Sequence, residues 1–427
     1  MGHPVRFRDA AALAAAVVAL AACGAAPARR PAPTPHATAR ATATPTPTRP
    51  RPTPTASATI PAGIQLTDVS FVSPTLGFAL GENCRAAQSC LAVTLATADG
   101  GGHWRAAPAP VAAVGSTSVS AVPGESADSV SRITFANPQD GWLWGPGLFA
   151  TSDGAATWTR VATTGPVLAL AAVGADVWAV QADCGGAGAG GACPLVLESA
   201  PLGGGSWSPV AGLPSVDGMA AALTATGGGD AWIEAVVPTA GGSGTALLIY
   251  ATADGGSTWV RRADPCPTPP AGSADPLAAY GSATVWLGCV GQEAAGSQAK
   301  AIYTSADGGS SWTLAGSSGP AAAGVPAAQG RVPAGGYLDQ LALTGPGVGW
   351  MALGRGTLVV SRDGGRSWTP AIAAGAVAAG SGILRVTFVA GSGWAIANGV
   401  SLPGGSAAAV VYRTGDGGGS WSPVPIG

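Results

Sequence analysis

Tryptophan recurs at a nearly constant interval along most of this 427-residue chain. Seven tryptophans, from Trp104 to Trp421, are separated by 54, 49, 52, 53, 56 and 53 residues. Six of them end a segment of the form [Ser/Thr]-x-Asp-x-[Gly/Ala]-x-x-Trp, here called a repeat turn, and the seventh ends a degenerate version, Ser199–Trp207 (SAPLGGGSW). A fixed period of about 50 residues predicts a repeat architecture, and propeller blades have about this length.

A second motif precedes each turn and consists of an apolar stretch, a small residue and an aromatic residue. Its seven copies are Gly77-Phe78, Gly141-Trp142, Val177-Trp178, Ala231-Trp232, Val285-Trp286, Gly349-Trp350 and Gly393-Trp394. Each unit then divides into four short strands separated by turns rich in Gly, Pro and Asp. In the second unit we expect these strands at 132–136, 141–145, 148–151 and 157–162.

These units predict an all-β fold over 64–427, a seven-bladed β-propeller of four-stranded antiparallel blades. The 67 glycines also argue against a helical protein, because glycine weakens helix interiors. The degenerate turn keeps Gly203, Gly204, Gly205 and Trp207, so we expect it to form a blade like the others.

The turns resemble the Asp-box, or bacterial neuraminidase repeat, and the whole unit resembles the blades of the photosystem II assembly/stability factor family and its relatives outside photosynthesis. The resemblance covers about 64–427 and implies the fold rather than an activity, since the same box occurs in sialidases, glycanases and sorting-receptor propellers. In a tight turn an aspartate and a hydroxyl can accept backbone N–H groups. We therefore predict a structural role, rather than a catalytic one, for Asp99, Asp153, Asp254, Asp307, Asp363 and Asp416.

The first 63 residues have the composition of a targeting region and a spacer. Residues 1–22 combine early arginines with a 13-residue apolar run and end in Leu20-Ala21-Ala22 before Cys23, which resembles the lipobox of bacterial lipoproteins. We expect Cys23 to be acylated; the alternative is an ordinary signal cleaved near an alanine. Residues 23–63 are rich in Pro, Thr and Ala and predict a disordered, semi-rigid linker. The protein is then expected outside the cytoplasm, attached to the outer face of the cell membrane by lipid alone.

Six further cysteines lie in the repeat region. Two pairs occupy matching places in units 1 and 3, and the third pair remains, so we predict the disulfides Cys84–Cys90, Cys184–Cys193 and Cys266–Cys289. The alternative, a metal site, lacks a Cys-x-x-Cys spacing, and His103 is the only histidine of the repeat region. No cofactor and no metal are expected.

Binding is the function that these residues favour. Sialidase chemistry would need an arginine cluster and a Tyr–Glu pair, and the family's Arg-Ile-Pro signature is absent. A net charge of −2 argues against nucleic acid as a partner. We predict a non-enzymatic, monomeric scaffold for an extracytoplasmic protein or glycan; the alternative is a sialidase-like glycoside hydrolase or a carbohydrate-binding propeller.

Propellers bind ligands at the central channel, through the innermost strand of each blade and the loops. Counting three residues back from each strand's apolar anchor selects Asp68, Arg132, Leu168, Ala222, Pro276, Gln340 and Arg385. The four polar positions, Asp68, Arg132, Gln340 and Arg385, are our candidate ligand contacts and are here called the channel cluster; the alternative is that they are solvated strand ends. Three long connections are further candidates, namely Val111–Val130, Arg261–Asp275 and Ser317–Gly336.

Overall fold

The computed structural model describes residues 59–86, 89–115, 128–185, 191–240, 244–267, 274, 276–319, 326–373, 377, 382–401 and 407–426. All of them lie in one compact unit that runs from Pro54 to Gly427. The predicted signal peptide, Cys23 and nearly all of the linker fall outside the described residues. Parts of the three long connections named above also fall outside the described residues.

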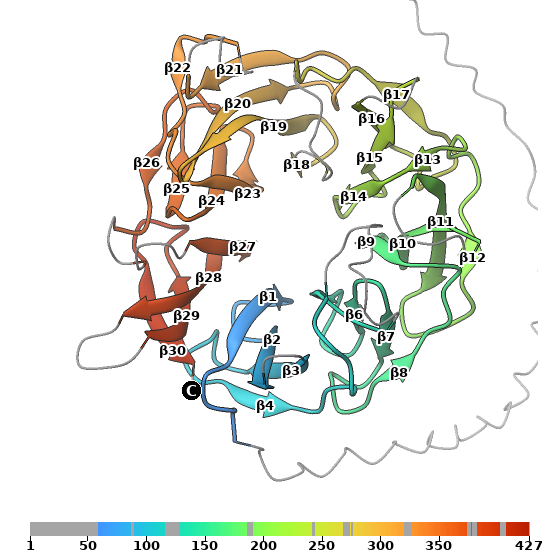
Figure 1. Ribbon diagram of the computed structural model, residues 1–427, viewed down its shortest axis with the longest axis vertical. Helices are drawn as coiled ribbons and strands as arrows, with labels where there is room; N and C mark the ends of the chain where they lie inside the picture. The colour runs from blue at the N-terminus through green and yellow to red at the C-terminus, as the bar shows by residue number, and fades with distance from the viewer. Residues whose placement is uncertain are drawn as a thin grey trace, which may run out of the picture. The chain divides into compact units, whose positions relative to one another are not determined.

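Seven sheets surround a central channel, and each is built from consecutive strands, as predicted (Figure 1). Blades 1 and 2 contain β1 (Gln65–Phe71), β2 (Gly77–Ala86), β3 (Ser89–Thr97), β4 (Arg105–Ala107), β5 (Arg132–Phe135), β6 (Gly141–Trp144), β7 (Leu148–Thr151) and β8 (Thr159–Arg160). Blades 3 and 4 contain β9 (Val167–Val173), β10 (Asp176–Ala182), β11 (Cys193–Pro201), β12 (Ser208–Pro209), β14 (Ala220–Ala225), β15 (Ala231–Pro238), β16 (Thr245–Thr252) and β17 (Val260–Arg262).

The remaining three blades follow the same order from the channel outward. Blade 5 contains β18 (Leu277–Tyr280), β19 (Thr284–Ala294), β20 (Ser297–Ser305) and β21 (Thr313–Ser317). Blades 6 and 7 contain β23 (Tyr337–Gly345), β24 (Val348–Gly354), β25 (Leu358–Ser361), β26 (Thr369–Pro370), β27 (Ile383–Val389), β28 (Ser392–Ser401), β29 (Ala407–Thr414) and β30 (Ser422–Ile426). Two short strands extend the pattern beyond the prediction: β13 (Asp217–Gly218) pairs with β11, and β22 (Gly330–Arg331) pairs in parallel with β21.

Each repeat turn is closed by its own hydroxyl and carboxylate. In blade 6 the buried Ser361 hydroxyl donates to Asp363 Oδ1 at 2.8 Å and accepts the N–H of Gly365 at 2.9 Å. Asp363 Oδ1 also accepts the N–H of Ser367 at 2.9 Å. The same contacts recur in the other five turns, so all six carboxylates are used inside the turns that contain them.

Blades 1 and 7 form separate sheets with no common strand. The ring is therefore closed by contacts between side chains and the neighbouring blade. Asn398 of β28 accepts the Leu66 N–H at 2.8 Å and donates to the Leu66 carbonyl at 2.7 Å, which ties the last blade to the first strand. The Phe71 and Trp394 rings stack across the same junction at 3.6 Å between centroids. The Phe78 and Phe135 rings stack in the same way between blades 1 and 2, at 3.6 Å between centroids.

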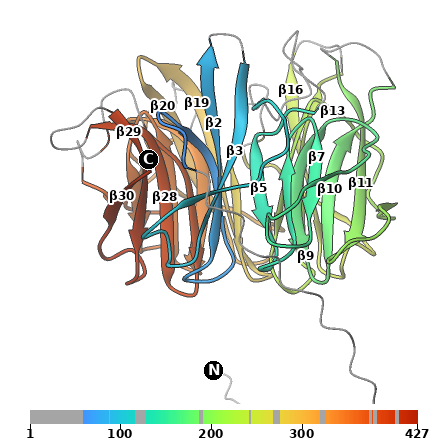
Figure 2. The same ribbon diagram turned by 90° about the horizontal axis from the view of Figure 1, so that it is seen from below.

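Three disulfides join the predicted pairs, Cys84–Cys90, Cys184–Cys193 and Cys266–Cys289. The first links directly opposed residues of the β2–β3 hairpin, which projects past the neighbouring blades in side view (Figure 2). Disulfides form and persist in oxidising compartments, so they indicate a location outside the cytoplasm. Within the described residues, no helix is long and apolar enough to cross a membrane.

Candidate ligand site in the central channel

The seven strand positions selected from the sequence all face the channel. Leu168, Ala222 and Pro276, from blades 3 to 5, line a cavity of about 1090 Å³ together with Arg132, Gln340 and Arg385. A smaller cavity of about 280 Å³ is lined by all four residues of the channel cluster. The structure therefore brings the candidate ligand contacts together from blades 1, 2, 6 and 7, although they are spread over more than 300 residues of sequence.

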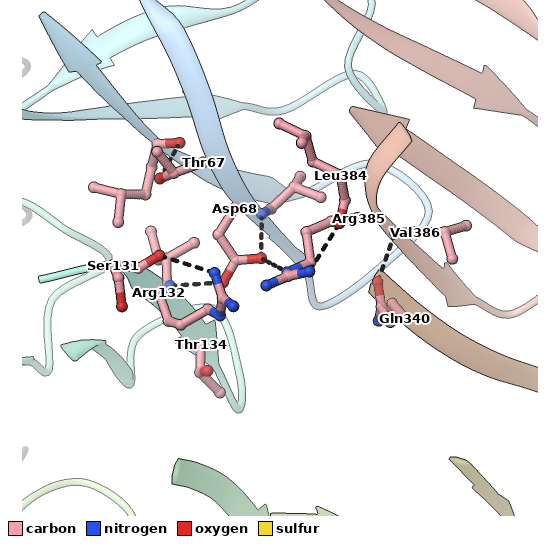
Figure 3. A network of polar contacts seen from close by, with 12 residues as sticks. Thr67, Asp68, Ser131, Arg132, Thr134, Gln340, Leu384, Arg385 and Val386 are labelled. Atoms are coloured by element: carbon pink, nitrogen blue, oxygen red, sulfur yellow. Dashed lines mark hydrogen bonds and ion pairs between the residues drawn. The ribbon is translucent and has the colours of Figure 1, made fainter. Parts of the chain in front are cut away.

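Asp68 lies between the two guanidinium groups of the cluster (Figure 3). Its buried carboxylate accepts the Ile133 N–H at 3.0 Å and the Val69 N–H at 2.9 Å, so it also joins blade 1 to blade 2. Arg385 Nε is 3.8 Å from Asp68 Oδ1. Burial raises the pKa of Asp68 to about 6, against the opposing effects of Arg132 and the two N–H groups.

Gln340 makes a similar connection between blades 6 and 7. Its side-chain oxygen accepts the Val386 N–H at 2.9 Å. Ser70 adds a second bond between blades 1 and 2 by accepting the N–H of Phe135, and Gln298 joins blades 5 and 6 by accepting the N–H of Leu338. Two members of the channel cluster thus help to hold neighbouring innermost strands together, a role that a count of strand positions does not reveal.

The two arginines keep most of their hydrogen-bonding capacity. In the described part of the chain, Arg132 Nη1 donates to the Ser131 carbonyl at 3.4 Å and Arg385 Nη1 donates to the Leu384 carbonyl at 2.8 Å. Each guanidinium has five N–H donors arranged to match a carboxylate or phosphate. Within the small cavity, one aspartate lies between two arginines, and this excess of positive charge is suited to a single anionic group. The larger cavity beside it is also lined by carboxylates, namely Glu82, Glu234, Glu293 and Asp339.

A third cavity, of about 690 Å³, shares the channel and contains residues that we had not proposed as ligand contacts. Glu293, Tyr337, Asp339 and Arg355 line it, and the Arg355 guanidinium lies 5.7 Å from the centre of the Tyr337 ring. Asp339 is exposed within the channel, yet the surrounding protein limits its hydration and raises its pKa to about 6, while Arg132 acts in the opposite direction.

Sialidase chemistry would need three converging arginines and a Tyr–Glu pair. The cavity of about 1090 Å³ contains two arginines, Arg132 and Arg385, together with Tyr337, Glu293 and Asp339, and Arg355 lines the adjoining third cavity. Among the described residues, no hydrogen bond joins Tyr337 to Glu293. The channel therefore gathers many of the residue types that a sialidase uses, but its three arginines do not line one cavity.

No protein family and no curated protein matches the sequence. Two solved structures of YCF48, a photosystem II assembly factor, are similar in fold. The one described as "YCF48 bound to D1 peptide" has a TM-score of 0.50 at 17% identity, covering 80% of this chain and 93% of that one. The other, from Cyanidioschyzon merolae, has a TM-score of 0.51 at 14% identity, covering 80% and 95%.

A glycoside hydrolase of family GH74 from Niastella koreensis overlaps more loosely, with a TM-score of 0.29 at 12% identity over 85% of each chain. At these identities the likeness establishes the propeller fold alone. It agrees with the resemblance seen in the repeats.

Proposed function

We propose that this propeller is a non-enzymatic scaffold and that its channel binds an acidic peptide segment of an extracytoplasmic partner protein. The observation that carries the proposal is the pair Arg132 and Arg385, which flank one buried aspartate in a single cavity. Hydrogen bonds from guanidinium to carboxylate are among the stronger ones in proteins, and their forked geometry adds specificity.

The two arginines suit the carboxylate of an acidic peptide, and they would suit that of an acidic glycan as well. A YCF48 of the same fold has been solved with a D1 peptide, which supports peptide binding as a use of such propellers. The scaffold would act as a monomer and without a cofactor.

The predicted anchor gives this scaffold a place to act. Lipid on Cys23 and the linker at 23–63 would hold the propeller away from the membrane surface. Cys23→Ala should move the protein to the secreted soluble fraction or block its processing. Retention of the variant in the membrane at the level of the parent would contradict the anchor.

The binding proposal is tested with synthetic acidic peptides, each prepared with a free and with an amidated C-terminus, titrated into the propeller by calorimetry. Replacing both arginines, Arg132→Ala with Arg385→Ala, should weaken binding at least about tenfold, because a hydrogen bond to a charged group contributes about 1.5–3 kcal/mol. The control variant changes two exposed arginines of outer strands, Arg105→Ala with Arg261→Ala, and should bind like the parent. Equal affinity of the two double variants would contradict the channel site.

A further inference from the structure

In three of the six intact blades, the tryptophan of the repeat turn lies close to an aromatic ring of the preceding blade. The Trp259, Trp368 and Trp421 rings lie 5.9, 6.1 and 5.9 Å from those of Trp178, Trp286 and Trp350. The turn glycines pack there as well: a Cβ added at Gly256 would lie 2.7 Å from Trp178, and one added at Gly101 would lie 3.5 Å from Trp394. The turn therefore acts as a plug between blades.

The turn of blade 3 meets blade 2 differently, because Leu202 and Trp207 pack against the apolar cluster that contains Trp142. It has Pro201 and Leu202 where the others have the aspartate, and it is one residue longer. A Cβ added at Gly203 or Gly204 would meet nothing within 4 Å. In the described part of the chain, no ring contact joins Trp207 to Trp142, and the turn tryptophans of blades 1, 2 and 5 likewise make no ring contact with the preceding blade.

A cleft of about 210 Å³ opens at this junction, beside β7, β8 and β11. Trp142, which is only 4% exposed, and the half-buried Trp207 contribute its aromatic surfaces, and Pro201 borders them. Exposed hydroxyl residues from blade 2, Ser152, Thr157 and Thr159, line the cleft too. The cleft thus combines aromatic faces with hydroxyl groups.

From this combination we infer that the cleft between blades 2 and 3 binds one neutral pyranose ring. Sites for drug-sized ligands occupy about 300–1,000 Å³, so a cleft of about 210 Å³ suits a ligand of a single ring. Among the described residues that line the cleft, Asp140 is the only charged one, and the lack of an arginine or lysine among them disfavours an anionic ligand. A proline ring would leave the hydroxyls without new partners, whereas a sugar offers them both donors and acceptors.

The binding test uses glucose, galactose, mannose and N-acetylglucosamine, observed by saturation-transfer NMR and by tryptophan fluorescence on the full propeller. A ligand of about twelve non-hydrogen atoms is expected to bind with a Kd of about 1 mM. Glucuronic acid should bind more weakly than its neutral counterpart. Failure of all four neutral sugars to bind at about ten times that concentration would overturn the inference.

The decisive variant restores an intact turn. Pro201→Asp combined with deletion of Leu202 converts the segment to SADGGGSW, which matches the turn of blade 7 apart from its first two residues. This turn should pack against Trp142, abolish sugar binding and leave the channel cluster unchanged. Persistence of binding in a folded variant would show that the cleft is not the site.

A milder pair of variants does not depend on rebuilding the turn. Thr159→Val removes a hydroxyl from the cleft and should weaken sugar binding several-fold, whereas Thr369→Val, at the same position of blade 6, should not. Equal affinities for these two variants would overturn the inference. The inference would also be overturned if a proline-rich peptide bound, no sugar bound, and Thr159→Val left the affinity for the peptide unchanged.

Discussion

Aspartate occupies two contrasting regions of this propeller, the repeat turns and the channel. In the turns, donated hydrogen bonds lower the pKa, to about 2 for Asp254, chiefly through the Thr258 hydroxyl and N–H. In the channel, burial dominates and raises the pKa of Asp68 and Asp339 to about 6. The surroundings thus stabilise the ionised form of the aspartate side chain in one region and disfavour it in the other. Its role depends on its surroundings more than on its identity.

The largest effect is expected at the hydroxyl that organises a turn. Ser361→Ala removes a buried group that bonds both Asp363 and the Gly365 N–H, and should cost about 1–3 kcal/mol of unfolding free energy because a buried donor loses its partner. Thermal or urea unfolding measures this loss. The control Ser310→Ala, at an exposed turn serine, should stay within about 0.5 kcal/mol of the parent. Equal effects of the two variants would show that the turn hydroxyl is dispensable.

A smaller effect, with a characteristic pH dependence, is expected at a turn carboxylate. The folded pKa of Asp254 is depressed, so its stabilisation is complete above its usual value of 3.8 and is lost as the pH falls towards about 2. Asp254→Asn should therefore be less stable than the parent at pH 7, and the difference should shrink below pH 4, as measured by unfolding at several pH values. Asp217→Asn, at an exposed position, serves as the control. A difference that does not vary with pH would argue against ionisation as its source.

The opposite sign is expected in the channel. The folded pKa of Asp339 is raised, so its neutral form stabilises the fold fully below about 3.8, and that contribution is lost as the pH rises through about 6. Asp339→Asn should be as stable as the parent at low pH and more stable at pH 7.5, by less than about 1 kcal/mol because the group is exposed to water in the channel. A variant that is less stable than the parent at pH 7.5 would refute the contrast between the two regions.

The last prediction is that the protein does not turn over a sialidase substrate. A fluorogenic sialoside should not be cleaved, because the three-arginine clamp and the Arg-Ile-Pro signature are missing from the sequence pattern. Fluorescence release is compared between the parent, Tyr337→Phe and Asp339→Asn. Measurable turnover in the parent that either variant abolishes would overturn the proposal of a non-enzymatic scaffold.

Much of the fold could be predicted from residues close together in the sequence. The tryptophan period predicted seven blades, and in blade 2 the expected strands at 132–136, 141–145 and 148–151 agree with the observed ones to within one residue. The fourth, expected at 157–162, is shorter than predicted and covers only Thr159–Arg160. The degenerate turn still forms a blade, as expected. Strand alternation and turn chemistry are local, so a repeated sequence repeats its structure. The added strands β13 and β22 depend on contacts outside the unit pattern and were not predicted.

The sequence by itself determined the blade count, the turn hydrogen bonds, the disulfide pairs and the strand positions that face the channel. Only the tertiary structure decided what those positions meet: the interblade bonds of Asp68 and Gln340, the closure of the ring by Asn398, and the cleft beside Trp142. It also placed Asp339, which the count of strand positions omitted, in the channel. The physical reason is that periodicity is encoded within one blade, whereas burial, charge pairing and cavities arise between residues that are far apart in the chain.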